Sequence, residues 1–149
     1  MKEPPLSTVL SYTNPKVLDR YQRDYPDNKL SASDAFQNLM KYLWLSAKLK
    51  KEKFEAPVGK KPQFASLVFP VMREIDDMWH TFLLFTRDYR EFCLQHFDLF
   101  LDHTPRVDGD PVPTAETIEG WVSYIGKHLG ETTLRQWFSP LLNSEEAAA

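Results

Sequence analysis

Apolar residues recur every three or four positions over several stretches of this chain, the spacing that is typical of amphipathic helices. The clearest stretch begins at Pro70, a residue suited to the first turn of a helix, and continues to about residue 100. With about 100° of rotation per residue, one broad and strongly aromatic stripe contains Ile75, Met78, Phe82, Phe85, Tyr89, Cys93, His96, Phe97 and Phe100. We therefore predict a long central helix over residues 70–100 that packs through this stripe.

The same periodicity predicts shorter helices on both sides of the central one. They are expected at residues 15–25, 31–53 and 114–129, followed by a short helix carrying Leu134, Trp137 and Phe138. Prolines and glycines indicate loops at 54–67 and 105–113. The predicted fold class is all-α: one domain over residues 1–149, a bundle of four to five helices with one long central helix, an extended arm at 1–14 and a frayed tail at 143–149.

Composition narrows the class of protein. A chain of 149 residues fits one domain, and its net charge of −3 is too small to indicate a nucleic-acid or acidic-lipid partner. The single cysteine, Cys93, excludes an internal disulfide framework and suits a reducing compartment. No apolar run is long enough to cross a bilayer, and the first residues do not resemble a secretory signal. We expect a cytoplasmic protein.

A polar face of the predicted central helix offers the candidate catalytic residues. Asp76 and His80 lie one turn apart, and Arg87 falls on the same face as a candidate binding residue. A histidine oriented by a carboxylate is what a general base or a metal ligand requires. An ion pair on a helix surface has the same spacing. In that second interpretation, Asp76 and His80 tie the helix to a neighbouring loop, the one that holds His103.

The candidate metal ligands are Asp76, His80, Asp102 and His103. On a straight helix the last two residues lie about 30 Å from His80 at 1.5 Å per residue. His103 can therefore join His80 only if the helix breaks early or the chain doubles back. We expect His80 to pair with Asp76 and with a group from another segment, without a stoichiometric metal. No cofactor is expected, and a divalent metal is the alternative.

Other reactive side chains have simpler explanations. Cys93 and His96 fall on the apolar stripe, which predicts a buried thiol and a satisfied core histidine. Trp79 is likewise expected to be buried. A cluster of lysines surrounds the loop at 54–67, and Lys60 and Lys61 are candidate binding residues for phosphates or an acidic partner. A solvated helix end explains the same cluster.

The string IDDMWHTF, residues 75–82, continues into further recognisable positions. Ile75, Asp76, Trp79 and His80 form its core, and the later matches are Thr86, Tyr89, Phe92, Cys93, Phe97, Phe100, His103 and Pro105. This pattern resembles a poorly characterised bacterial family related to the N-terminal helical domain of plant glycine-rich-domain proteins. The resemblance covers residues 69–105, about a quarter of the chain.

The resemblance has departures as well as matches. Asp98 stands where the family often has glycine, Asp102 replaces a histidine, and Phe82 occupies the place of a second histidine found in plant members. These changes weaken a metal site built on paired histidines, although Asp102 offers an oxygen ligand. The family has no settled activity, so the resemblance implies a helical fold and names no reaction.

The sequence favours a non-enzymatic function, because a complete catalytic constellation is missing. We expect a small soluble helical interaction or regulatory module whose partner is a protein. The alternative is a metal-dependent or acid–base enzyme centred on Asp76 and His80. A concave pocket at His80 would favour the enzyme, and a flat, exposed apolar patch would favour the module.

Overall fold

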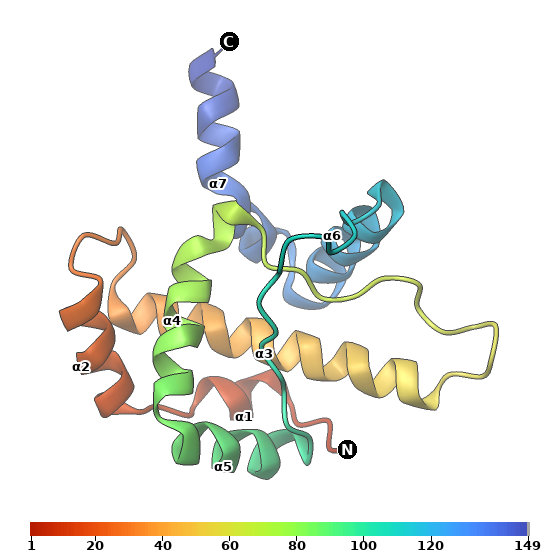
Figure 1. The fold of residues 1–149 in the computed structure, drawn as a ribbon, viewed down its shortest axis with the longest axis horizontal. Coiled ribbons are helices and arrows are strands. Elements are labelled where there is room, and N and C mark those ends of the chain that lie inside the picture. The colour runs from red at the N-terminus through yellow and green to blue at the C-terminus, as the bar shows by residue number, and fades with distance from the viewer. Residues whose placement is uncertain (149) are drawn as a thin grey trace.

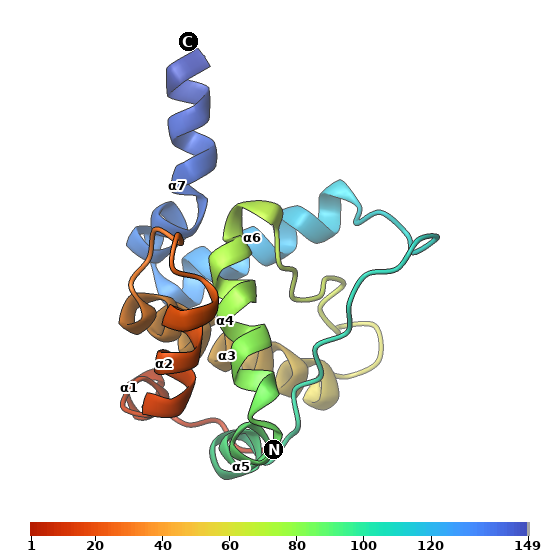
Figure 2. The same ribbon diagram turned by 60° about the vertical axis from the view of Figure 1, so that its left-hand side comes forward.

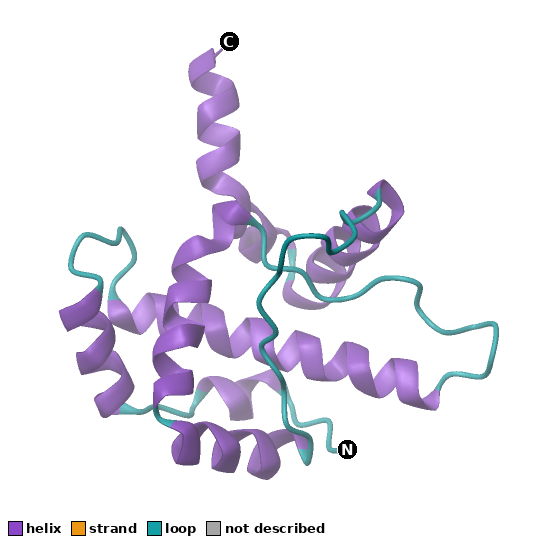
Figure 3. Cartoon of the chain, viewed as in Figure 1, coloured by secondary structure: helices purple, strands orange, loops and turns teal. Residues whose placement is uncertain are grey.

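The computed structural model describes the backbone of residues 1–148 and the side chains of residues 1–139. All secondary structure in this part of the chain is helical, which confirms the all-α class (Figures 1 and 3). The elements are α1 (Leu6–Leu10), α2 (Pro15–Asp24), α3 (Ala32–Glu55), the 3-10 turn η1 (Pro70–Met72), α4 (Arg73–Leu84), α5 (Thr86–Phe97), α6 (Ala115–Leu129) and α7 (Glu131–Ala148). The helices are more numerous than the four or five expected.

Helix α3 is the centre of the bundle. It is the longest helix, with 24 residues, and it contacts α1, α2, α4 and α6 (Figures 1 and 2). Because neighbours cover it on several sides, its apolar residues are not confined to one narrow stripe. Its fully buried members include Leu39, Met40, Leu43 and Leu45.

Three helices begin where local capping signals predict. The Asn14 side chain accepts a hydrogen bond from the Val17 N–H at the start of α2. Ser31 caps α3 and Thr114 caps α6 in the same way. Each cap satisfies one of the backbone N–H groups that a helix start leaves without a partner. The helices expected at 15–25, 31–53 and 114–129 are therefore present.

The prediction of one long helix over residues 70–100 is wrong. The chain leaves helical geometry at Phe85 (φ −95°, ψ 68°), which separates α4 from α5. On one straight helix, Phe82 and Phe92 would lie about 15 Å apart along the axis. Here their ring centroids are 5.5 Å apart, and Tyr12 packs against both rings, stacked on Phe82 at 6.0 Å and tilted against Phe92 at 4.8 Å. The break folds the aromatic stripe onto itself around a side chain from the N-terminal segment.

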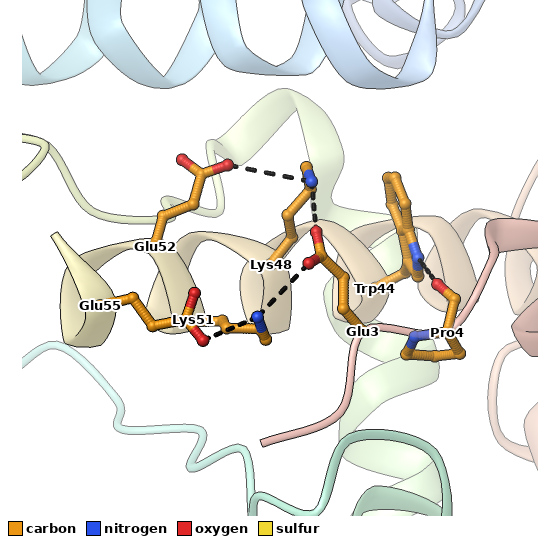
Figure 4. Close-up of polar contacts among 7 residues, drawn as sticks. All are labelled: Glu3, Pro4, Trp44, Lys48, Lys51, Glu52 and Glu55. Atoms are coloured by element: carbon orange, nitrogen blue, oxygen red, sulfur yellow. Dashed lines mark hydrogen bonds and ion pairs between the residues drawn. The ribbon is translucent and has the colours of Figure 1, made fainter.

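The two ends of the chain differ from the expectations. Residues 1–14 are not only an extended arm, because they contain α1 and pack on α3. The carbonyl of Pro4 accepts a hydrogen bond of 2.8 Å from the Trp44 indole, and Glu3 pairs with Lys48 (Figure 4). At the other end α7 runs to Ala148, so the backbone of the tail is helical there. Residue 149 and the side chains beyond residue 139 lie outside the described part.

None of the helices in the described residues combines the length and the apolar character needed to cross a lipid bilayer.

Candidate metal centre

The loop after α5 returns the chain to α4. Asp98 ends α5 in the left-handed region (φ 51°), and the following residues run back beside α4 toward α6 (Figures 1 and 2). Leu101 is buried, and its carbonyl accepts a hydrogen bond from the Tyr89 hydroxyl. The same hydroxyl accepts a hydrogen bond of 3.1 Å from the Trp79 indole N–H. This chain of hydrogen bonds fixes the returning loop against both helices.

The return brings His103 to Asp76 and His80. The Nε2 atom of His103 lies 2.9 Å from Oδ1 of Asp76, and the Nε2 atom of His80 lies 3.4 Å from Oδ2. One potential ligand atom from each residue lies within 4.8 Å of the other two. The argument from a 30 Å separation therefore fails, because α4 ends at Leu84 and the chain doubles back.

Aromatic stacking sets the plane of the His103 ring. The ring lies 4.0 Å from the Trp79 ring at an interplanar angle of 12°, and 4.9 Å from the His80 ring at 27°. Trp79 is 5% exposed, so the surface on which His103 stacks belongs to the core. The imidazole of a loop residue is thus held by the helix that supplies the other two members of the centre.

The carboxylate of Asp76 is stabilised in its charged form. Burial alone would raise the pKa of Asp76, but the adjacent His103 and His80 imidazoles outweigh burial and lower it. Oδ1 of Asp76 and Nε2 of His103 are both inaccessible to solvent, and neither makes a well-directed hydrogen bond, although they are only 2.9 Å apart. Two buried polar atoms without a well-directed partner are a place where a third group, such as a metal ion, would satisfy both.

The centre is closed on one side and open on the other. The exposed fraction of the side chain is 14% for His103, 25% for Asp76 and 49% for His80. Two imidazole nitrogens and one carboxylate oxygen are a common ligand set for a catalytic zinc, which keeps its fourth position open. Metal–ligand bonds of about 2.0–2.2 Å in tetrahedral geometry place ligand atoms about 3.4 Å apart, so the His103–Asp76 pair at 2.9 Å would open slightly while the widest pair closes. The half-exposed His80 has room for that rotation.

The chain was compared with known protein families and one family model matches it. The sequence model of a family described as UCP032817-like matches residues 8–110, more than two thirds of the chain. The chain belongs to the UCP032817-like family. The matched region contains all three members of the centre and ends before α6. No curated protein and no solved structure gave a significant match.

The family match confirms part of the resemblance seen in the sequence. Membership in an uncharacterised family is shown, whereas the description of that family mentions neither glycine-rich-domain proteins nor the motif around Asp76 and His80.

Three of the four candidate metal ligands come together, and Asp102 does not. Asp102 is exposed and does not belong to the group formed by Asp76, His80 and His103. Arg87 lies beyond the break, in the first turn of α5, so it no longer continues the face of α4 that carries Asp76. Lys60 is exposed, and Lys61 donates a hydrogen bond to the Lys53 carbonyl. These two lysines belong to a different surface.

The expected burial of Cys93 and His96 is confirmed, whereas Phe100 at the end of the stripe is 41% exposed. Cys93 is fully buried, and burial raises the pKa of its thiol, which disfavours the nucleophilic thiolate. His96 is 9% exposed, with its Nδ1 atom 2.9 Å from the Phe92 carbonyl. The supporting role of Tyr89 was missed, although a tyrosine on an apolar stripe signals a hydroxyl in need of a buried partner.

Proposed function

We propose that the protein is a metal-dependent enzyme in which Asp76, His80 and His103 hold one divalent transition-metal ion. The observation that carries the proposal is the convergence of two imidazoles and one carboxylate from two separate segments, with ligand atoms within 4.8 Å. Convergence from distant segments is more specific than the one-turn pair alone, because any exposed helix can carry an Asp–His pair four residues apart.

The ligand set favours zinc. Magnesium and calcium prefer shells made of oxygen atoms, whereas imidazole nitrogen suits zinc and iron. A zinc ion with three protein ligands lowers the pKa of its bound water to about 7, which supplies hydroxide at neutral pH. The exposed side of His80 is where water and substrate would reach the ion. This chemistry suits hydrolysis of a polarised carbonyl or phosphoryl group.

The surroundings of the centre also support the proposal. A ligating histidine needs a fixed ring plane, and for His103 the stack on Trp79 provides it. A ligating carboxylate must be ionised, and the lowered pKa of Asp76 meets that requirement. The resemblance of residues 69–105 to the helical domain of plant glycine-rich-domain proteins is part of this proposal, because its motif residues are those that build the centre.

The direct test is elemental analysis of protein purified without chelator, followed by calorimetric titration of the metal-free protein with zinc. We expect one ion per chain in the parent and a loss of that ion in His80→Ala, His103→Ala and Asp76→Asn. The matched controls are Asp102→Asn, an acid next to His103 but outside the centre, and His128→Ala. Both should keep the ion.

Two results would contradict the metal centre. A dissociation constant for zinc of about 1 mM or higher, which is a binding free energy of roughly 4 kcal/mol or less, would be too weak for a functional site. Equal loss of zinc in Asp102→Asn and in His103→Ala would indicate a different ligand set. If zinc binds as expected, activity is tested on nitrophenyl esters and phosphates, with His80→Ala as the inactive reference.

A second candidate is the regulatory form of the interaction or regulatory module, and a pocket away from His80, of the size that small molecules occupy, favours it. The pocket has a volume of about 450 Å³ and lies between α3, the start of α4 and α7, with Lys41, Ile75 and Trp137 among its lining residues. This size is within the range of small-molecule sites. A fragment screen followed by amide chemical shifts should perturb Lys41 and Trp137 but not His103. A screen without hits at this pocket would remove that support.

A cytoplasmic location is part of the proposal for either function. Its support is that Cys93 is the single cysteine, so the fold uses no internal disulfide.

A further inference from the structure

The C-terminal end of α3 and the loop after it concentrate positive charge. Residues 48–61, here called the α3 tip, contain six lysines and two glutamates. Their formal charge is +4, so the rest of a chain of net charge −3 carries −7. The small net charge of the whole chain hides this asymmetry, which is what decides the kind of surface the tip can approach.

The α3 tip also exposes two large apolar side chains. Phe54, in the last turn of α3, is 75% exposed, and Val58 is 95% exposed. The Lys60 N–H donates to the Pro57 carbonyl at 3.0 Å, and Gly59 has a φ of +89°, as the third residue of a type II turn requires. Val58 therefore occupies the first corner of a tight turn and projects from it.

The outer part of the tip, residues 54–60, stands away from the rest of the fold. In Figures 1 and 3 the end of α3 and the following loop form one edge of the molecule. The Lys61 ammonium donates to the Lys53 carbonyl, so the loop is fastened to the end of the helix instead of trailing from it. Phe54 and Val58 are thus displayed on an ordered protrusion.

Five of the six lysines of the tip divide into two sets, and the sixth, Lys61, donates to the Lys53 carbonyl. Lys48 and Lys51 are engaged: Glu3 bridges them, and Glu52 and Glu55 lie beside them (Figure 4). The other set consists of Lys50, Lys53 and Lys60, and no carboxylate in residues 1–139 forms an ion pair with them. Burial, and then the neighbouring charge of Lys50, hold the pKa of Lys53 below its usual value.

We propose that the α3 tip docks reversibly on an anionic lipid membrane, with Phe54 and Val58 entering the headgroup region and Lys50, Lys53 and Lys60 facing lipid phosphates. Apolar side chains flanked by lysines are the composition that binds this interface. A convex tip gives a protein partner no groove to fill. Of the two anchors only Phe54 has a ring that could stack on a nucleic-acid base, so binding of single-stranded RNA is one outcome that the test below separates from membrane binding.

The proposed cytoplasmic location fits the negative charge of the membrane surface that the tip would meet. The cytoplasmic leaflet carries anionic lipids, and each lysine near such a surface strengthens binding by about fivefold, or roughly 1 kcal/mol. Two apolar anchors and three free lysines predict peripheral, salt-sensitive attachment, not permanent insertion. This inference does not depend on the metal centre, which lies on α4 and the loop after α5.

The test is flotation of the full chain with vesicles of phosphatidylcholine, alone or mixed with phosphatidylserine. We expect binding to the mixed vesicles only, and its loss in high salt. Replacing both anchors, Phe54→Ser with Val58→Ser, should weaken binding by roughly tenfold or more. Lys50→Glu with Lys60→Glu should weaken it at least as much.

The matched control replaces exposed apolar residues elsewhere, Leu84→Ser with Val112→Ser, and should bind like the parent. All of these positions are exposed, so the melting temperature should stay unchanged and show that the variants fold. Failure to bind mixed vesicles, or equal binding to neutral ones, would overturn the proposal. So would binding to single-stranded RNA that depends on the lysines and is indifferent to Phe54 and Val58.

Discussion

Trp79 connects the hydrophobic core to the candidate metal centre, so replacing it should affect stability and metal affinity separately. Its ring packs at 5.4 Å against Tyr42 on one helix and at 4.0 Å against His103 on the returning loop. Its indole N–H donates to the Tyr89 hydroxyl, which in turn donates to the Leu101 carbonyl. Removing the ring takes away core packing, one hydrogen bond and the surface on which His103 stacks.

The magnitudes follow from these contacts. Trp79→Ala should lower the free energy of unfolding by about 3–5 kcal/mol, as truncation of a buried aromatic residue does. For a chain of this length each kcal/mol shifts the melting temperature by about 2–4 °C, so the loss is roughly 6–20 °C. Trp79→Phe keeps an aromatic face and loses the hydrogen bond, which should cost about 1–2 kcal/mol.

The affinity for zinc should depend on whether residue 79 offers a flat ring for His103 to stack on, and not on the free energy of unfolding of the variant. Trp79→Phe should bind zinc within a few-fold of the parent, whereas Trp79→Leu, which has no flat ring, should bind about 10–100 times more weakly. Urea unfolding of the metal-free proteins gives the free energy of unfolding. Titration with zinc, at a temperature where every variant is folded, gives the affinity for the metal.

A matched control separates general destabilisation from a specific effect. Trp137 is buried to a similar degree, at 3% exposure, and its indole donates to the Asn38 amide oxygen, away from the centre. Trp137→Leu should lose stability and keep its affinity for zinc. Trp79→Leu binding zinc as tightly as the parent would refute the idea that stacking orients His103. Trp79→Ala melting within about 3 °C of the parent would refute its role in the core.

Further predictions concern the fold. Gly120→Ala places a Cβ 2.6 Å from the Phe64 ring and should destabilise the protein by about 1–3 kcal/mol. Gly126→Ala meets only a 3.5 Å contact with Leu134 and should stabilise it by up to about 1 kcal/mol. Thermal melts in which both changes have the same sign would contradict this reasoning. Cys93 should react slowly with a thiol reagent in the native protein and rapidly after denaturation, and fast native labelling would contradict its burial. Asn14→Ala removes the α2 cap and a bond to Asp88, and urea unfolding should show a loss of about 1–2 kcal/mol, with a smaller loss in Asn14→Ser, which retains a capping hydroxyl.

Elements with local signals were predictable from the sequence. The starts of α2, α3 and α6 follow from Pro15, Ser31 and Thr114, because a proline suits the first turn of a helix and a cap acts on backbone groups two or three residues away. The apolar period within each helix depends on burial of one face, which the sequence also records. These features require no knowledge of which segments meet.

The break at Phe85 could not be derived from periodicity alone. No proline or glycine interrupts the apolar stripe there, and the stripe continues with helical spacing on both sides. What decides the break is tertiary packing, in which Tyr12 from the N-terminal segment contacts Phe82 and Phe92 together. A weak local sign was present, since Asp88 is an acid in what becomes the first turn of α5.

The candidate centre was half predictable for the same reason. Asp76 and His80 follow from one-turn spacing on a single helix. His103 was named as a candidate but was placed too far away, because that distance assumed a straight helix. Asp102 was named beside it, yet the direction of its side chain depends on a loop conformation that spacing does not specify.

The break in the helix makes the candidate metal centre possible, and an ion bound there would stabilise the break. The turn at Phe85 lets the loop after α5 return, and His103 then joins Asp76 only while the loop stays on α4. An ion held by both segments would therefore stabilise the turn as well as the site. Zinc at a hundred times its dissociation constant would add about 2.7 kcal/mol to the free energy of unfolding, if it binds the folded state alone. That gain should disappear in His103→Ala, whose ligand lies on the loop, and persist in Asp102→Asn on the same loop. A gain of equal size in both variants would mean that the ion binds somewhere other than across the turn.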